Sequence, residues 1–333
     1  MNRSKIMRVP YKRISKNFLI YLISLFVLSV VVFWAVSYSP GDPLQAYYGE
    51  HLDHMTEAQM IAARHKLGLD GSLVTQYVEW MNRLFHGDMG FSLKYRTPVS
   101  AVLGGFFINT VVLGVISYVL TFTLAILLAV ICVYYEDRWI DKLISQVGTL
   151  VFYLPTFWVA LLLILVFNVN LGWLPGSGAY EPGNANDWVD RLRHIVLPVI
   201  VMLIAHVWYY AYMIRNKLLD ETRKDYVLLA KMKGLSSFSI LVKHCLRNIA
   251  PTIFSVMAIG TNHIIGGSYV VEAVFAYPGL GNLAVESAKL HDYNLLMIIV
   301  LITGAVVIGS SYIAQGISEQ VDYRMKEREE VGQ

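Results

Sequence analysis

The chain has 333 residues, of which 56% are hydrophobic and only 15% are charged, and its mean hydropathy is +0.51. A soluble domain has about one-quarter charged residues, so this composition excludes an ordinary soluble protein and indicates one built for lipid. The net charge of +3 is too small to indicate a nucleic-acid partner.

Six stretches are long and apolar enough to cross the roughly 30 Å of membrane hydrocarbon as helices. They are 18–38, 107–134, 144–169, 195–214, 249–275 and 295–317. No small-residue cleavage site follows the first stretch, so we interpret it as a retained helix and not as a signal peptide. Pro155 and Pro198 lie inside two of the spans and are expected to kink them.

The lysines and arginines are distributed unevenly between the two sides of these spans. Nineteen of the 27 precede the first span, follow the last, or lie between spans two and three or spans four and five. The positive-inside rule therefore places both termini in the cytoplasm, and an even number of spans agrees with this. The predicted organisation is a basic N-terminus (1–17), a first helix (18–38), an extracellular region (39–106), a membrane core (107–317) containing a cytoplasmic loop (215–247), and a cytoplasmic tail (318–333).

The extracellular region is too long for a simple connection and is expected to contain structure. Thr56 and Gln59 form a capping-box pattern that predicts a helix to about residue 67, ended by Gly68. Ser72 is expected to cap a second helix that Gly87 ends. These helices would face a partner protein or cover the ends of the spans, and the sequence fits both equally.

The cytoplasmic loop has the pattern of a helix over 220–233. Acidic residues come first and lysines last, which suits the helix dipole. Tyr226, Leu229 and Ala230 are expected to share one face. Gly234 is placed to end the helix in the left-handed conformation.

A second short helix is expected after this glycine, over 238–246, capped by Ser236 or Ser237. The predicted shape is a helix, a sharp turn and a helix beneath the membrane, which would present a knob to another molecule. Positive charge alone explains why the loop stays inside, but it does not explain this shape.

Sequence patterns for chemistry on this chain are absent. There is no G-x-x-x-x-G-K-[ST] nucleotide loop and no H-E-x-x-H zinc motif. Cys132 lies in an apolar run and Cys245 in a basic loop, so no disulfide framework is expected. The chain is therefore predicted not to be an enzyme, and energy for any pumping must arrive through contact with another subunit.

The loop motif "DYVLLAKMKGL…HCLRN" resembles the EAA loop of ABC-importer permeases, of the dipeptide, oligopeptide and nickel B-type. Further matches follow the order of that family along most of the chain. They are "PGDP" (40–43), "KLGLD" (66–70), "YVEW" (77–80), "HGDMGFS" (86–92), "PTFW" (155–158), "LGWLP" (171–175), "LRHIVLP" (192–198), "VVEAVFAYPGLG" (270–281) and "HDY" (291–293). One departure is Asp322-Tyr323-Arg324, where the family usually has Asp-Pro-Arg. His244-Cys245-Leu246-Arg247 also differs from the general EAA ending.

This resemblance implies an all-α integral membrane protein with six transmembrane helices, a small extracellular helical region and a cytoplasmic coupling loop. The expected function is one half of a translocation pathway in the bacterial cell membrane, for peptides delivered by an extracellular solute-binding protein. The implied partners are a second homologous permease in a heterodimer, two cytoplasmic ATPase subunits that hold ATP and Mg, and the lipid bilayer. No cofactor is expected on this chain itself. The residues implied to couple to the ATPase are Asp225, Tyr226, Ala230, Lys233, Gly234, Leu235, His244, Arg247 and Asn248.

Polar side chains inside the membrane are candidates for the pathway. In the fifth span Asn262, His263 and Ser268 are read as a polar wall, although packing between helices explains such residues as well. Glu272, near the outer boundary, is expected to hydrogen-bond to the loop that follows. His206 is interpreted as a hydrogen-bonded contact between helices and not as a ligand.

The cargo stays open at this level. Nickel or a metal chelate is the main alternative to a peptide, and His51 and His54 have a spacing that a metal pair would need. A solvated loop explains these histidines better, so no metal site is predicted. An ion-driven secondary transporter is the rival of a different class, but the sequence shows no inverted repeat and few buried acids. A membrane enzyme would need a catalytic cluster that the sequence lacks.

Overall fold

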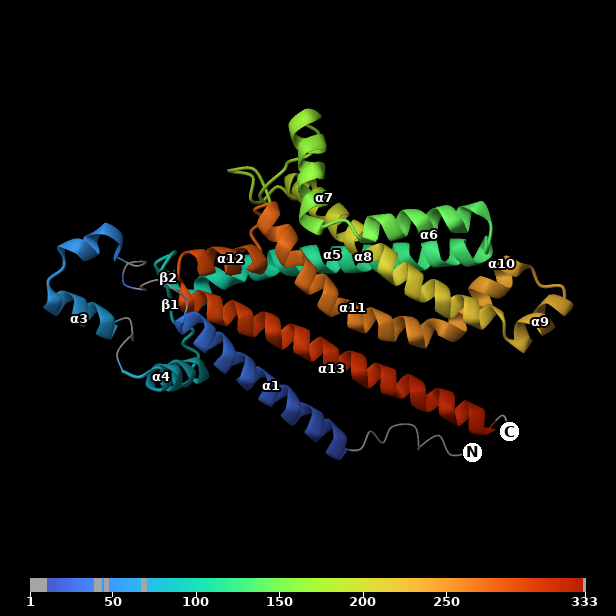
Figure 1. The fold of residues 1–333 in the computed structure, drawn as a ribbon, viewed down its shortest axis with the longest axis horizontal. Coiled ribbons are helices and arrows are strands. Elements are labelled where there is room, and N and C mark those ends of the chain that lie inside the picture. Colours follow the sequence, from blue (N-terminus) through green and yellow to red (C-terminus); the bar gives the residue numbers. More distant parts are fainter. Residues whose placement is uncertain (1–10, 39–43, 45–47, 67–70, 332–333) are drawn as a thin grey trace. The chain divides into compact units, whose positions relative to one another are not determined.

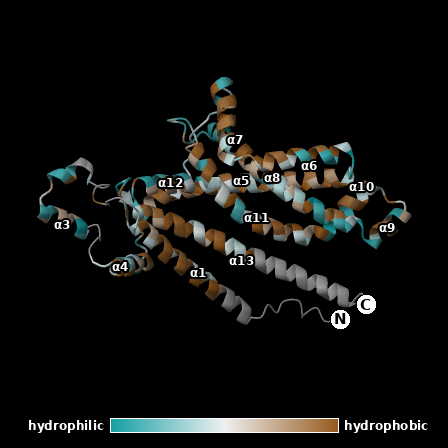
Figure 2. Ribbon diagram, viewed as in Figure 1, coloured by the Kyte–Doolittle hydropathy of each residue, from teal (hydrophilic) through white to brown (hydrophobic). Residues whose placement is uncertain are grey.

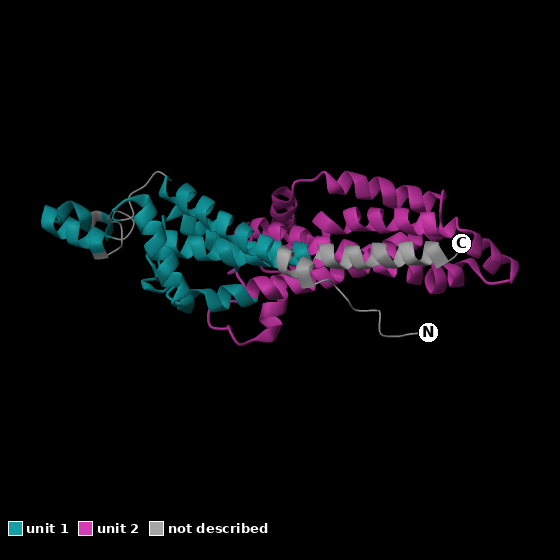
Figure 3. Ribbon diagram, turned by 90° about the horizontal axis from the view of Figure 1, so that it is seen from below, with its two compact units in different colours: residues 1–108, 279–312 teal, residues 109–278, 313–333 magenta. Residues whose placement is uncertain are grey.

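The computed structural model describes residues 11–38, 44, 48–66 and 71–331. The described chain is almost entirely helical and divides into two compact units, which Figure 3 colours separately. Unit 1 comprises residues 1–108 and 279–312, and unit 2 comprises residues 109–278 and 313–333. Three long helices, α5 (Val99–Tyr134), α11 (Leu246–Val274) and α13 (Tyr293–Val331), contain much of the apolar sequence (Figure 1).

Unit 1 is built on α1 (Tyr11–Ser37) and the first part of α13. The α1 residues from Phe18 to Ser37 are apolar throughout, and their hydrophobic colouring is plain in Figure 2. Helix–helix contact is close here: a Cβ on Gly304 of α13 would lie 2.2 Å from Leu28 Cδ2. The Tyr21 hydroxyl donates to the main-chain oxygen of Ala305 over 3.2 Å, which fixes the register of the two helices.

The remaining elements of unit 1 lie at one end of these helices. They are η2 (Gly49–His54), α3 (Glu57–Lys66), α4 (Leu73–Phe85), β1 (Phe91–Ser92), β2 (Thr97–Pro98) and α12 (Leu280–Lys289). The two strands pair antiparallel with Phe91 opposite Pro98 and Ser92 opposite Thr97.

Both capping predictions for this region are confirmed. Thr56 and Gln59 make the reciprocal bonds of a capping box, with Thr56 N to Gln59 Oε1 at 2.9 Å. Ser72 caps α4 by accepting from Thr75 N, and Gly87 follows with φ of +84°. Gly68 lies outside the described residues, as does most of "PGDP" and "KLGLD".

Two motifs far apart in the chain meet in unit 1. Asp292 is fully buried and accepts from the Ser92 hydroxyl and from Lys94 N. The Lys94 ammonium pairs with Glu286 of α12. Burial disfavours the charge on Lys94, but the interactions with Glu286 and Tyr95 together outweigh this effect, so the pKa of Lys94 is raised. The strand pair is thereby fastened to the start of α13.

Unit 2 holds the rest of α5, then α6 (Trp139–Phe152), α7 (Thr156–Leu163), a π-helical turn η3 (Ile164–Asn170) and α8 (Trp188–Thr222). After α8 come α9 (Asp225–Met232), α10 (Ser237–Ile240), a second π-helical turn η4 (Leu241–Cys245) and α11. Helices α6, α7 and α11 all pack on α8, which is the most buried helix.

Among the residues that the structure describes, five helices are long and apolar enough to span a membrane, or up to six if one bent pair counts as a span. The bent pair is α6 with α7–η3, at an angle of 98°, so the expected kink near Pro155 lies within the predicted span over 144–169. Pro155 stands at the break, where its missing N–H and its ring prevent the helix from continuing. Pro198 behaves differently, because α8 runs through it without interruption.

The last helix is longer than its apolar stretch. Backbone helix continues from Tyr293 through residues 322–324 to Val331. The family's usual proline would prevent this, since proline inside a helix removes a hydrogen bond and clashes with the preceding turn. Tyr323 in its place allows α13 to extend beyond the membrane span.

Candidate functional site

The turn between α9 and α10 is a Schellman motif. Gly234 has φ of +83°, and its N–H donates to Lys231 O over 2.9 Å. Leu235 N donates to Ala230 O over 3.2 Å, which completes the paired bonds of this helix ending. The prediction that Gly234 ends the helix in the left-handed conformation is confirmed. A Cβ at Gly234 would meet nothing within 4 Å, so the position is open to solvent on this chain.

The helix after the turn begins where the sequence placed it. Ser236 caps α10 by accepting from Ser239 N over 3.3 Å. Helical structure then continues through η4 into α11, so Ser237–Val274 forms one uninterrupted helical run. A displacement of the turn would consequently reach the membrane span without passing through a flexible joint.

The helix before the turn starts later than predicted. The expected helix over 220–233 is wrong at its beginning, because Asp220 and Glu221 belong to the last turn of α8. The three residues predicted to share a face differ in burial: Ala230 is buried and Tyr226 is half-buried, but Leu229 is exposed. Val227 takes the inward position in place of Leu229.

Large apolar side chains are exposed along this segment, beside the exposed Asp225, Lys231 and Lys233. Five large side chains with 42–77% of their surface exposed lie on it: Leu228, Leu229, Met232, Leu235 and Phe238. We call these five the α9–α10 surface. A soluble loop would not gather such residues without a partner, because an exposed apolar cluster is typical of an interaction site.

Glu221 connects the helices beneath this surface. Its Oε1 accepts from the Tyr226 hydroxyl at 2.9 Å and from Asn248 Nδ2 at 3.2 Å, and its Oε2 pairs with Lys224 Nζ at 2.7 Å. The carboxylate thus joins the end of α8 to α9 and to the start of α11. Burial raises the pKa of Tyr226, as do its hydrogen bonds to Cys245 and Glu221, so the phenol stays protonated and donates.

A second ion pair joins α8 to α6. Arg215 donates from Nε to Asp141 Oδ1 at 2.9 Å and from Nη2 to Asp141 Oδ2 at 2.6 Å. This bidentate geometry is the strongest form of a protein ion pair. Asp141 is buried and also accepts from Asp137 N, so the pair holds the connection between α5 and α6.

A cavity of about 330 Å³ opens above this ion pair, between α6 and α8. Its walls carry Phe152, Tyr153, Tyr209 and Tyr212, and Arg215 lies at one end. Phe152 and Tyr209 stack with ring centroids 6.2 Å apart. Five of the twelve lining residues are aromatic, and Arg215 supplies the charged group of the lining.

His263 of α11 extends this aromatic surface. Its ring lies 5.9 Å from that of Tyr209, and its Nδ1 is 3.0 Å from the Tyr210 hydroxyl. Ile259, His263, Gly266 and Val270 are exposed at helical spacing and form one face of α11. The structure therefore brings His263 to an open face beside the cavity.

The other intramembrane candidates lie differently. Asn262 is half-buried, and Ser268 is buried with its hydroxyl donating to Ile265 O of its own helix. Glu272 is buried and accepts from Thr110 of α5 at 2.8 Å, whereas the following loop reaches its main-chain oxygen through Tyr277 N. His206 donates within its own helix to Met202 O, and its ring packs on Gly267 of α11.

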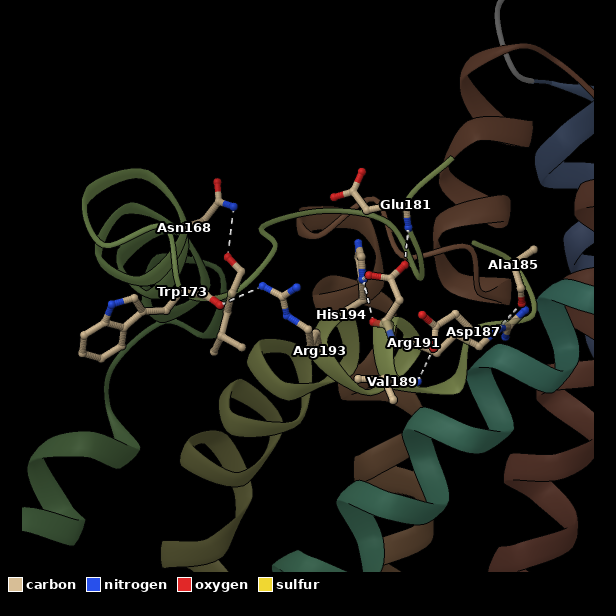
Figure 4. A network of polar contacts seen from close by, with 11 residues as sticks. Asn168, Trp173, Glu181, Ala185, Asp187, Val189, Arg191, Arg193 and His194 are labelled. Carbon is tan, nitrogen blue, oxygen red and sulfur yellow. Dashed lines mark hydrogen bonds and ion pairs between the residues drawn. The ribbon is translucent and has the colours of Figure 1, made fainter. Parts of the chain in front are cut away.

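A polar network organises the loop before α8 (Figure 4). Arg193 Nη2 donates to Trp173 O at 3.3 Å, and Asn168 Nδ2 donates to Leu174 O at 3.0 Å. The buried Asp190 accepts from Glu181 N at 2.6 Å. The motifs "LGWLP" and "LRHIVLP" thus contact each other through Arg193 and Trp173. These hydrogen bonds anchor the loop before α8 to the first turns of that helix.

The part of the chain that the structure describes contains no group of three or more His, Cys, Asp or Glu side chains able to hold a metal ion. His51 and His54 are both exposed in η2. Cys132 and Cys245 are buried free thiols.

These membrane-crossing helices, with an apolar helix–turn–helix projecting at one end, define a polytopic membrane transport subunit. The chain belongs to the family described as binding-protein-dependent transport system inner membrane component, whose model matches residues 121–327. The N-terminal model of the same systems matches residues 11–127. The chain is accordingly a multi-pass permease subunit of the bacterial ABC-importer class and not a catalytic enzyme.

Relatives match along nearly their whole length. A putative peptide permease protein of Brucella suis biovar 1 is 31% identical over 309 residues, covering 92% of this chain and 97% of the relative. The oligopeptide transport system permease protein AppB of Bacillus subtilis is 31% identical, covering 92% and 95%. The glutathione transport system permease protein GsiC of Escherichia coli O6:H1 is 33% identical, covering 84% and 87%.

One solved structure supports the fold. An inward-facing MetNI methionine ABC transporter chain matches with a TM-score of 0.50 and 16% sequence identity. The match covers 66% of this chain and 97% of the other.

Sequence reasoning missed the two polar joints. The sequence predicts acidic residues at the start of a helix near Glu221, but no pairing of Asp141 with Arg215. Neither carboxylate stands out in the sequence, because Asp220 precedes Glu221 directly and Glu136 and Asp137 lie just before Asp141.

Proposed function

We propose that this chain forms one half of a peptide pathway and receives mechanical work through the α9–α10 surface. Two ATPase subunits on the cytoplasmic side would bind ATP and Mg. One of them would contact the α9–α10 surface. A second, homologous permease would complete the pathway, and an extracellular binding protein would deliver the cargo. The observation that carries the proposal is the exposed apolar cluster on a rigid helix–turn–helix that continues directly into α11.

The residues expected to take part divide into two groups. Gly234, Leu235 and Lys233 lie at the turn and are exposed, so they are proposed to contact the ATPase. Tyr226 and Asn248 are bonded to Glu221, so they are proposed to hold the segment in position. Asp225, His244 and Arg247 are exposed and remain predicted contacts, while the buried Ala230 supports α9 from within.

For the pathway we propose His263 and the aromatic cavity between α6 and α8. Asn262 and Ser268 remain predictions from the sequence, although Ser268 is buried within this chain. A wall of tyrosines and one histidine suits uncharged backbone and apolar side chains, which a peptide offers. The relatives named for oligopeptide and glutathione transport favour the same class of cargo.

The coupling proposal is tested at Gly234. A β-branched residue is strained at φ of +83°, whereas asparagine tolerates the left-handed region. In the reconstituted importer, Gly234→Val should lower peptide uptake per ATP hydrolysed by about tenfold or more, and Gly234→Asn should lower it less. Full transport by Gly234→Val would refute the role of this turn.

The cargo is tested separately by uptake of labelled dipeptide, glutathione and nickel in a strain that lacks this gene. Loss of peptide or glutathione uptake with nickel uptake unchanged supports the proposal. Loss of nickel uptake alone favours the metal alternative. Transport by the purified chain without an ATPase would instead indicate a secondary transporter.

A further inference from the structure

Helix α4 has two sets of apolar side chains. One set packs within unit 1, and the other is exposed. Trp80 is buried, and Leu73, Tyr77 and Leu84 pack beside it in the core of unit 1. Val74, Val78 and Phe85 are 62%, 58% and 82% exposed, respectively. Their spacing of four and seven residues places all three on one face. We call these three residues the α4 apolar stripe.

The exposed polar residues of α4 lie on a separate face of the helix, next to this stripe. Thr75, Glu79, Asn82 and Arg83 are exposed, and helical geometry centres them near Glu79. The helix therefore has three faces: one packed on protein, one polar, and one apolar with no cover in this chain. An amphipathic helix that lies in the plane of a membrane surface has this combination of faces.

The depth of α4 follows from its contacts with α1. The Tyr77 hydroxyl lies 2.8 Å from Ser29 Oγ, and the Tyr77 ring lies 5.2 Å from Phe33 and 6.4 Å from Phe26. The spanning part of α1 ends at Ser37, so Ser29 is about 12 Å inside that end at 1.5 Å per residue. One leaflet contributes about 15 Å of hydrocarbon. Tyr77 therefore reaches into the hydrocarbon layer, and α4 lies beside the end of α1 (Figure 1).

The lipid-facing surface of α1 is continuous with α4. Phe26, which contacts Tyr77, is itself 56% exposed, and Leu22 and Val27 near it are 45% and 52% exposed. A membrane-spanning helix with such residues facing outward meets acyl chains. Tyr77 holds α4 against this surface of α1, so the acyl chains that meet α1 are close enough to cover the stripe as well.

We propose that α4 lies in the plane of the membrane and inserts its apolar stripe among the acyl chains of the leaflet around the C-terminal half of α1. Its polar face, centred on Glu79, points to the water and headgroups. In the orientation proposed above, this is the outer leaflet. The inference concerns the membrane boundary of unit 1 and does not depend on the cargo.

The test uses nitroxide labels on the assembled importer in phospholipid nanodiscs. Val78→Cys and Phe85→Cys report on the stripe, and Glu79→Cys is the matched control one residue away on the polar face. Cys132 and Cys245 are replaced by alanine, and the background is kept only if it retains transport. Collision rates with oxygen, which concentrates in hydrocarbon, and with a water-soluble nickel chelate are compared.

At Val78 and Phe85 the ratio of oxygen to nickel collision rates should be several-fold higher than at Glu79. Similar high nickel access at Val78 and Glu79 would place the stripe in water and overturn the proposal. Labels at Val78 and Phe85 that neither reagent reaches would show a protein partner on the stripe, and would also overturn it.

Discussion

At the scale of single residues, Glu221 joins the proposed coupling segment to the helices around it. One buried carboxylate accepts from α9 and from α11 and pairs with the lysine before α9. A buried acceptor that several donors share cannot be removed cheaply, because each donor is then left without a partner. The position of the α9–α10 surface therefore depends on a residue that does not belong to that surface.

We expect Glu221→Ala to destabilise the assembled importer by about 1.5–3 kcal/mol, the typical contribution of hydrogen bonds to a charged group. Transport per ATP hydrolysed should fall as well, because α9 loses its bond to α8. Thermal unfolding in detergent and paired uptake and ATPase assays measure the two effects. The neighbouring Asp220→Ala is the control, since Asp220 is exposed, and equal effects of the two variants would contradict this role.

At the scale of elements, glycines set how closely α11 approaches its neighbours. A Cβ on Gly260 would lie 2.5 Å from Phe122 Cζ of α5 and 3.1 Å from Tyr210 Cζ of α8. Both rings are almost fully buried, with their centroids 4.6 Å apart and their planes tilted, so neither has space to move away. In lipid, helix association relies on such close packing because there is little hydrophobic drive between apolar helices.

Gly260→Ala is therefore expected to lower stability by about 1–3 kcal/mol, the usual cost of overpacking. Gly266→Ala provides a matched control in the same helix, since a Cβ there meets nothing within 4 Å. A gain of helix propensity makes that control neutral or slightly stabilising. The measurement is thermal unfolding of both variants in the same detergent, and equal unfolding temperatures would argue against close contact at Gly260.

At the scale of the whole molecule, the orientation of the spans decides which partner each surface can reach. The α9–α10 surface must face the cytoplasm if an ATPase is to bind it. The loop before α8, with Asn184 at an exposed turn, then faces the exterior. This orientation rests on the distribution of lysine and arginine.

Cysteine labelling in intact cells tests the orientation. Asn184→Cys should react with a membrane-impermeant maleimide in intact cells. Lys231→Cys should react only after the membrane is permeabilised. The native cysteines are both buried, which keeps the background low. The reverse pattern would place the α9–α10 surface outside and exclude the proposed coupling.

The sequence by itself determined the local features of this protein. Gly234, Ser236, Ser72 and the pair Thr56 and Gln59 act through bonds within a few residues, so their caps and turns were readable from spacing. The apolar spans were readable for a similar reason, because each must satisfy its own backbone in lipid. Tertiary structure decided the contacts between separate elements, such as Asp141 with Arg215 and Ser92 with Asp292. It also decided that Val227, and not Leu229, is buried. It also turned the stretch around Pro155 into two helices at 98°. These outcomes depend on which helices pack together, and apolar sequences that resemble one another so closely do not specify their neighbours.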